Sequence, residues 1–264
     1  MFGTCSDGTN YELAGPEDGQ PIVFIHGLGL NKEVWQFQTA AFSGSYRTVT
    51  YDLFGHGDSP AAPQKPSLTV FSQQLAKVLE ACRLDSAVIV GFSLGGMIAR
   101  RFAQDYPEKT KALVILNSPH KRSKEAQADI LARVELARKE GPGATVEAAL
   151  VRWFTDSYRS SHPDVMNLVR RWVLANDPEI YPSNYEVLAS GIDEIVSPSP
   201  PISCPALIVT GDEDYGNGPE MTRAIASEIP GSTAVVLPGL RHMGLMEDPE
   251  AVNAPIRSFL ETLE

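Results

Sequence analysis

The stretch Val88-Ile89-Val90-Gly91-Phe92-Ser93-Leu94-Gly95-Gly96-Met97-Ile98-Ala99 decides the fold of this chain. It reads as an apolar strand, then a Gly-x-Ser-x-Gly pentapeptide, then the small residues that begin a helix. In this context a serine is held on a sharp, strained turn and becomes a nucleophile. A side chain at Gly91 or Gly95 would clash with the adjacent strand or helix. We therefore predict that the turn presents the Ser93 hydroxyl for attack.

Strand-like apolar runs alternate with helix-like stretches along most of the chain, which is typical of a parallel sheet. The expected strands are residues 21–26, 46–51, 86–92, 111–116, 205–210 and 233–237. Four of them contain continuous apolar runs without polar alternation, as expected of strands covered on both faces. The predicted fold class is therefore α/β, with a mostly parallel central sheet flanked by helices.

The alternation stops after Leu116, and only helical periodicity appears from about residue 120 to 196, where four short helices fit. Ser123 suits an N-cap, and Gly141-Pro142-Gly143 separates the first helix from the second. A proline-rich linker follows at residues 197–201. The expected organisation is a core of residues 1–118 and 200–264 with an all-helical cap at residues 119–199.

Composition narrows the function classes. The 264 residues carry a net charge of −11, which argues against binding of nucleic acid, because that surface needs clustered Lys and Arg. No apolar run of about 18 residues and no leader-like start is visible, so we expect no membrane span and a cytoplasmic protein. Three widely spaced cysteines show no zinc or redox spacing, and we expect them to pack in the core.

The acidic charge is unevenly distributed. Residues 119–199 carry 10 Lys and Arg against 12 Asp and Glu, whereas the remainder carries 12 against 21. Two interpretations are open. The less acidic segment either favours the approach of an anionic substrate under the helices, or it is an ordinary solvated helix surface, which the charge pattern favours.

Ser93 requires a base within hydrogen-bond reach, because a serine hydroxyl is a poor nucleophile at neutral pH. After such a turn the partners follow in the order acid, then histidine. His242 lies in a loop after a late strand, and we expect it to be the general base. His120 and His162 fall at the start of the helical segment or within it, where exposed or capping roles are expected.

Three carboxylates compete to orient His242. Asp212, Glu213 and Asp214 all follow the strand at residues 205–210. One would accept the Nδ1 proton of the histidine, and the others would serve as turn residues. The residues alone do not choose among the three.

Attack on an acyl carbonyl produces an oxyanion that needs preorganised N–H donors, each worth roughly 3 kcal/mol of barrier. The backbone N–H of Leu94, next to the serine, is one expected donor. The glycine-rich loop after an earlier strand, His26-Gly27-Leu28-Gly29, is expected to provide the second through the N–H of Leu28.

Over nearly its whole length the chain resembles the α/β-hydrolase superfamily. The stretches that carry the resemblance are His26–Gly29, Tyr51–Ser59, Gly91–Gly96, Gly211–Asp214, Gly239–Met243 and Glu247–Pro249. The resemblance implies the α/β-hydrolase fold, and it implies Asp214 as the acid, three residues after the glycine. The family usually has Arg where this chain has Phe54, a structural position. His56 and Asp58 are expected to structure their loop.

Within the superfamily the chain is similar to 3-oxoadipate enol-lactonases. The supporting residues are Met97, Asn117-Ser118, Arg152-Trp153-Phe154-Thr155, Pro163, Asp177-Pro178 and Tyr181. This resemblance implies an EC 3.1.1-like serine hydrolase that cleaves a small carboxylic ester or lactone through an acyl-enzyme. It implies no metal or organic cofactor, a small-molecule ester or lactone as the partner, and a monomer or small homo-oligomer.

Cap residues are the candidates for substrate binding. Trp153, Phe154 and Trp172 either line an apolar pocket or pack as ordinary helix aromatics. Arg152, or one of Arg170 and Arg171, is expected to bind a substrate carboxylate.

Other activities remain as alternatives. The same catalytic residues support hydrolysis of a C–C bond or cofactor-free perhydrolase chemistry. A non-catalytic ligand-binding protein on this fold is a further alternative.

Overall fold

The central feature of the computed structural model, which describes residues 1–263, is an eight-stranded sheet in the order β1-β2-β4-β3-β5-β6-β7-β8. The neighbouring strands from β4 to β8 in this order pair in parallel. β2 pairs antiparallel with both β1 and β4. The predicted mostly parallel sheet is confirmed. The strands are β1 (Phe2–Thr4), β2 (Asn10–Ala14), β3 (Pro21–Ile25), β4 (Arg47–Tyr51), β5 (Ala87–Phe92), β6 (Thr110–Leu116), β7 (Ala206–Gly211) and β8 (Thr233–Leu237).

All six predicted strands are present, with ends within one residue of the prediction. The sequence did not reveal β1 and β2. Both lie at one edge of the sheet, and every residue of β2 is half-buried. An edge strand of this kind lacks the continuous apolar run that marks the central strands.

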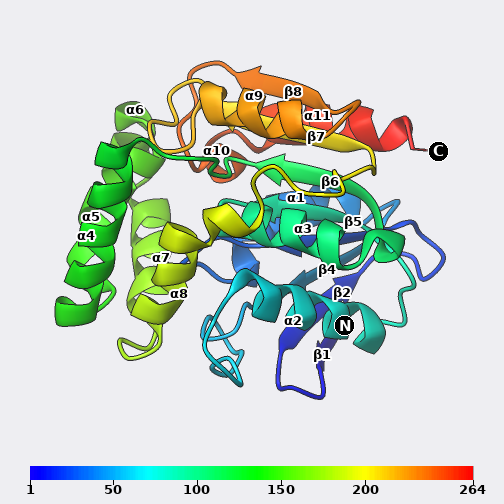
Figure 1. The fold of residues 1–264 in the computed structure, drawn as a ribbon, viewed down its shortest axis with the longest axis horizontal. Coiled ribbons are helices and arrows are strands. Elements are labelled where there is room, and N and C mark those ends of the chain that lie inside the picture. The colour runs from blue at the N-terminus through cyan, green and yellow to red at the C-terminus, as the bar shows by residue number, and fades with distance from the viewer. Residues whose placement is uncertain (264) are drawn as a thin grey trace.

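Helices cover both faces of the sheet, as predicted (Figure 1). Alternate residues of β3 enter opposite cores, with Val23 and Ile25 on one side and Ile22 and Phe24 on the other. Since successive strand side chains point to opposite faces, this explains the unbroken apolar runs. The first core is covered by α2 (Leu68–Ala81), α3 (Leu94–Asp105) and α9 (Pro219–Glu228), and the second by α1 (Gln36–Phe42), α10 (Gly244–Glu247) and α11 (Pro249–Glu261).

The segment after β6 contains five α-helices within residues 124–190, not the four predicted. They are α4 (Lys124–Glu140), α5 (Gly143–Trp153), α6 (Asp156–Ser161), α7 (Pro163–Leu174) and α8 (Tyr181–Ser190), and Figure 1 shows α4, α5, α7 and α8 gathered at one end of the sheet. The six-residue α6 is too short for a periodic signal, but Thr155 caps it by accepting from the Tyr158 amide. Ser123 caps α4 as predicted, and Gly141 ends it.

The remaining short elements are the 3₁₀ helices η1 (Lys32–Trp35), η2 (Pro107–Lys109) and η3 (Gly191–Glu194). Within residues 1–263 no helix combines the length and apolarity needed to cross a bilayer. Cys5 and Cys82 are buried, and the half-buried Cys204 packs against the same core, so the expected packing role is confirmed.

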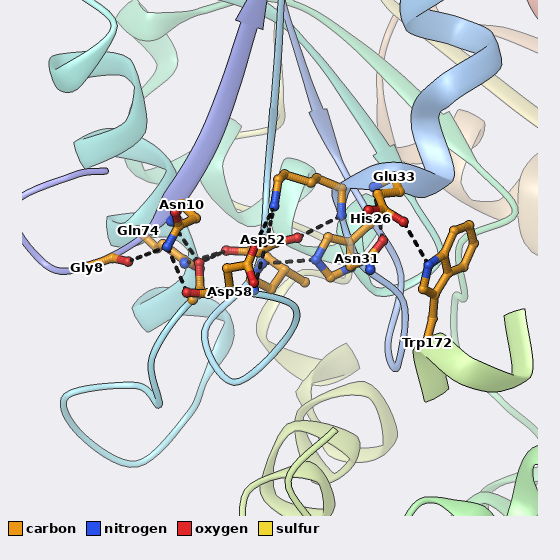
Figure 2. A network of polar contacts seen from close by, with 12 residues as sticks. Gly8, Asn10, His26, Asn31, Glu33, Asp52, Asp58, Gln74 and Trp172 are labelled. Atoms are coloured by element: carbon orange, nitrogen blue, oxygen red, sulfur yellow. Dashed lines mark hydrogen bonds and ion pairs between the residues drawn. The ribbon is translucent and has the colours of Figure 1, made fainter. Parts of the chain in front are cut away.

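Buried polar residues join the loops after β3 and β4, and Figure 2 shows part of this network. Lys32 Nζ contacts Asp52 at 2.6 Å and Asp58 at 3.2 Å. The Leu53 amide donates to His26 Nε2 at 3.0 Å, so the His26 proton sits on Nδ1 and is donated to the Gly27 carbonyl at 2.8 Å. These contacts fix the glycine-rich loop that follows β3.

The adjacent loop residues serve the structure, as expected. His56 is buried, and its Nδ1 lies 3.1 Å from the Phe54 carbonyl oxygen. The Asp58 amide donates to Asp52, and Phe54 packs against Phe71 with ring centres 6.5 Å apart. Phe54 thus replaces the family's usual arginine with a core contact.

Acid should destabilise the fold through two buried histidines. Burial lowers the pKa of His26 to about 4, and burial with the nearby His26 charge lowers the pKa of His56 to about 3, from an ordinary value of 6.5. Below pH 6.5 the unfolded chain binds protons that the folded chain does not. The free energy of unfolding should therefore decrease as the pH is lowered below 6.5. The loss should approach about 1.4 kcal/mol per pH unit for each histidine.

Urea unfolding at pH 7.5 and pH 5.0 measures this loss. His56→Gln should reduce the pH dependence, while His162→Gln, at an exposed histidine, should leave it unchanged. Equal stability of the wild-type protein at both pH values would contradict the expectation.

Candidate active site

The turn between β5 and α3 holds Ser93 in a strained backbone conformation, with φ of 55° and ψ of −115°. A Cβ atom on Gly91 would lie 2.2 Å from the Gly95 carbonyl oxygen, and one on Gly95 would lie 2.2 Å from the Ile25 carbonyl oxygen. Both distances are far below contact distance, so the predicted clashes with helix and strand are confirmed. Only glycine fits at these two positions.

His242, in the loop after β8, lies beside Asp214, in the loop after β7. Its Nδ1 is 2.8 Å from Asp214 Oδ2, and both side chains are buried. The carboxylate also accepts from Asn117 Nδ2 at 2.9 Å and from the amides of Gly216 and Asn217 at 3.1 and 3.0 Å.

These contacts set the charge of Asp214. Burial acts to raise its pKa, but the His242 charge and the hydrogen bonds from His242, Asn117 and Asn217 outweigh burial and lower the pKa. The carboxylate is therefore ionised at neutral pH. An ionised acceptor at Nδ1 holds the histidine proton there and leaves Nε2 as the basic nitrogen.

The structure separates the three neighbouring carboxylates. Asp212 Oδ1 accepts from the Gly239 amide at 2.7 Å, as a turn residue does. Glu213 forms an ion pair with Arg241 at 3.4 Å. Of the three, Asp214 is the one that hydrogen-bonds to His242, which is the residue that the family resemblance selected.

A cavity of about 310 Å³ joins these groups, since Ser93, Asp214 and His242 all line it. Gly27 and Leu28 line it as well. A Cβ on Gly27 would lie 3.2 Å from Ser93 Cβ, which shows how closely this loop approaches the serine. The Leu28 and Leu94 amides make no loop or turn hydrogen bond to the backbone of residues 1–263.

The other two downstream histidines lie elsewhere. His120 Nε2 is 3.0 Å from Glu228 Oε1, and His162 stacks on Tyr158 with ring centres 4.1 Å apart. Neither lines the cavity that contains Ser93.

The candidate substrate residues of the cap divide into two groups. Arg152 and Trp153 line the cavity, and the Trp153 ring stacks on the His242 ring with centres 6.1 Å apart. Phe154 does not line the cavity, because it is fully buried and stacks on Tyr158. Trp172 is buried, and its indole N–H donates to Glu33 at 3.0 Å (Figure 2).

The alternative arginines also lie outside the cavity. Arg170 forms a surface ion pair with Glu147, and Arg171 is exposed. Neither is placed to bind a ligand beside Ser93.

Several cavity residues were missed by the sequence analysis. They are Arg122, Asp129, Arg133 and Tyr185, all from the cap segment. No local motif marks them, because each reaches the cavity only through the packing of separate helices.

The loop that bears His242 is tied directly to the end of α5. The Met243 amide donates to the Trp153 carbonyl at 2.8 Å, and Arg241 donates to the carbonyls of Val151 and Phe154 at 3.0 and 2.9 Å. Cap and core therefore share the segment that carries the histidine.

A mostly parallel sheet with a serine on the turn after β5 and an acid and a histidine after β7 and β8 defines the α/β-hydrolase class of proteins. The chain belongs to that family, since the family described as alpha/beta hydrolase fold matches residues 20–249.

Named relatives cover almost the whole chain. It is 31% identical to (E)-2-((N-methylformamido)methylene)succinate hydrolase of Acinetobacter baylyi, over 93% of this chain and 92% of that protein. It is 28% identical to 3-oxoadipate enol-lactonase 2 of the same organism, over 96% and 92%. The crystal structure of the enol-lactonase from Burkholderia xenovorans superposes with a TM-score of 0.88 at 26% identity, covering 99% and 100%.

Adding one methyl group at the turn should destabilise the protein. Gly95→Ala places a Cβ against the backbone of β3, and we expect it to lower the free energy of unfolding by about 3 kcal/mol or to prevent folding. Gly44→Ala is the matched control, because a Cβ there meets nothing within 4 Å. Urea unfolding of both variants measures the difference, and equal midpoints would contradict the steric argument.

Proposed function

We propose that this protein is a serine hydrolase that cleaves a small carboxylic ester or lactone through an acyl-enzyme. Ser93 is the nucleophile, His242 the general base, and Asp214 the group that orients it. The observation that carries the proposal is the cavity shared by Ser93 and His242, with the histidine Nδ1 held on an ionised carboxylate. Relatives named as enol-lactonases support the same reaction class.

In the first half of the reaction Ser93 Oγ attacks the carbonyl carbon while His242 Nε2 takes its proton. The carbonyl oxygen becomes an oxyanion that accepts from the amides of Leu28 and Leu94. When the intermediate collapses, the C–O bond to the leaving group breaks and His242 returns the proton to the departing oxygen. When the substrate is a lactone, the acyl group and the leaving oxygen remain parts of one molecule.

In the second half water attacks the acyl-enzyme and gives its proton to His242, and Ser93 departs with that proton. The products are a carboxylic acid and the regenerated enzyme. The cavity of about 310 Å³ lies at the lower end of the usual range for ligand pockets, which favours a small acyl group.

Labelling with a fluorophosphonate probe tests the nucleophile. The wild-type protein should be labelled and should hydrolyse short aryl esters, whereas Ser93→Ala should do neither. Ser160→Ala, at an exposed serine of α6, is the matched control and should behave as wild type. A wild-type protein that is neither labelled nor active on esters and lactones would support the non-catalytic alternative.

A pair of isosteric variants tests the acid. Asp214→Asn should lower kcat by up to about ten-thousand-fold, because the amide stabilises the wrong histidine tautomer. Asp212→Asn should lower it by less than about threefold, since Asp212 only accepts from the Gly239 amide. Steady-state kinetics on one aryl ester compares them. Equal losses in both variants would remove Asp214 from its assigned role.

A further inference from the structure

Three arginines converge on the cavity that contains Ser93. Arg122 precedes α4, Arg133 lies within α4, and Arg152 lies near the end of α5. They come from three points of the cap segment, so their convergence is a product of helix packing.

None of the three forms an ion pair within residues 1–263. The Arg122 guanidinium donates to the carbonyls of Leu188 and Ala189 at 3.2 and 3.3 Å, and Arg152 donates to the Ala148 carbonyl at 3.1 Å. Arg133 Nε is buried without a hydrogen-bond partner. Carbonyls hold two of these cations in place, but no carboxylate neutralises them.

Exposed arginines of the same cap behave differently. Arg138, five residues after Arg133 on α4, forms an ion pair with Glu135, and Arg170 forms one with Glu147. Among the cap arginines outside the cavity only the exposed Arg171 also lacks an ion pair in the part of the chain that the structure describes, whereas all three cavity arginines lack one.

The charge of Arg133 acts on the other two arginines, and all three charges act on one hydroxyl. Burial, then repulsion by Arg133, lowers the pKa of Arg122 to about 10, and the same two causes lower the pKa of Arg152. Both guanidinium groups stay charged at neutral pH. Burial raises the pKa of the Tyr185 hydroxyl, while the charges of all three arginines oppose that rise. Tyr185 is therefore within electrostatic reach of the whole cluster.

The local charge balance indicates the charge of the ligand. Apart from the Asp214–His242 pair, the cavity lining contains one acidic side chain, Asp129, which is exposed and forms no ion pair within the described residues. Among the cavity residues from the cap segment, three positive charges face one negative charge, which leaves this side of the cavity with a net charge of about +2 that a dianion would neutralise. The negative charge of Asp214 lies on the other side, where the carboxylate accepts from His242, Asn117 and two loop amides. Guanidinium groups bind carboxylates through paired N–H donors.

We propose that Arg122, Arg133 and Arg152, with the Tyr185 hydroxyl, form a binding site for a substrate that carries two carboxylates in addition to the bond cleaved at Ser93. The position of this site relative to the reacting bond rests on the proposed function. The binding of a dicarboxylate itself rests only on the cavity and its arginines.

Protection of Ser93 from fluorophosphonate labelling tests the site. The probe ligands are succinate, glutarate and adipate, each compared with the monocarboxylate of equal chain length, and inorganic phosphate. We expect at least one dicarboxylate to protect at a concentration tenfold or more below that of its monocarboxylate. Arg133→Gln and Arg152→Gln should each raise its half-protecting concentration by about tenfold.

Arg170→Gln is the matched control, because Arg170 is a cap arginine outside the cavity. The dicarboxylate concentration that half-protects this variant should equal the concentration that half-protects wild type. Equal protection by monocarboxylates and dicarboxylates would overturn the proposal, as would equal protection by phosphate. Serine hydrolase activity would survive either result.

The shift of the melting temperature by the same ligands provides a second measurement that needs no reaction at Ser93. If wild type is not labelled, the proposed function fails, yet a dicarboxylate should still raise Tm in wild type and raise it less in Arg133→Gln. No Tm shift by any of the three dicarboxylates, together with no protection, would overturn the dicarboxylate site on its own.

Discussion

The contact of Gly95 with the Ile25 carbonyl is the constraint on which the site depends. Because no side chain separates the first turn of α3 from the end of β3, the loops after β3 and β5 meet, and Ser93 lies beside Gly27. The strained Ser93 backbone is held from both sides. Its amide donates to the Leu116 carbonyl at 2.9 Å, and Ser118 Oγ donates to its carbonyl at 3.0 Å. Surrounding hydrogen bonds thus offset a conformation that costs about 1–3 kcal/mol.

The histidine is positioned by core and cap together. Asp214, in the loop after β7, accepts from Nδ1 of His242. Arg241 and Met243, on either side of His242, donate to carbonyls at the end of α5. The Trp153 ring then covers the imidazole from the same segment. Since the His242 loop and the end of α5 share these bonds, displacing the cap there would also displace the base. The cap is therefore part of the catalytic geometry that we propose, in addition to covering the cavity.

The parts of the fold that sequence predicts are those with local signals. Strand-like apolar runs, continuous in four cases, revealed the six parallel strands, and the glycines around Ser93 revealed the turn. Asp214 has no local signal that separates it from Asp212, because its role depends on Asn117 and His242, which are remote in sequence. Arg133 was missed for a similar reason. It lies five residues from the exposed Arg138 on one helix, and only the helices packed around α4 distinguish a cavity residue from a surface residue.

The charge of the whole chain and the charge of the cavity have opposite signs. With a net charge of −11, the protein repels an anionic ligand at long range, yet three uncompensated arginines face the space beside Ser93. At physiological salt the repulsion is screened beyond about 8 Å, whereas charges inside a cavity are screened much less. Selection for an anion must therefore occur at contact and not during diffusional approach. The arginines of the cap segment are suited to selection at contact, because they act only on a ligand that has already entered the cavity.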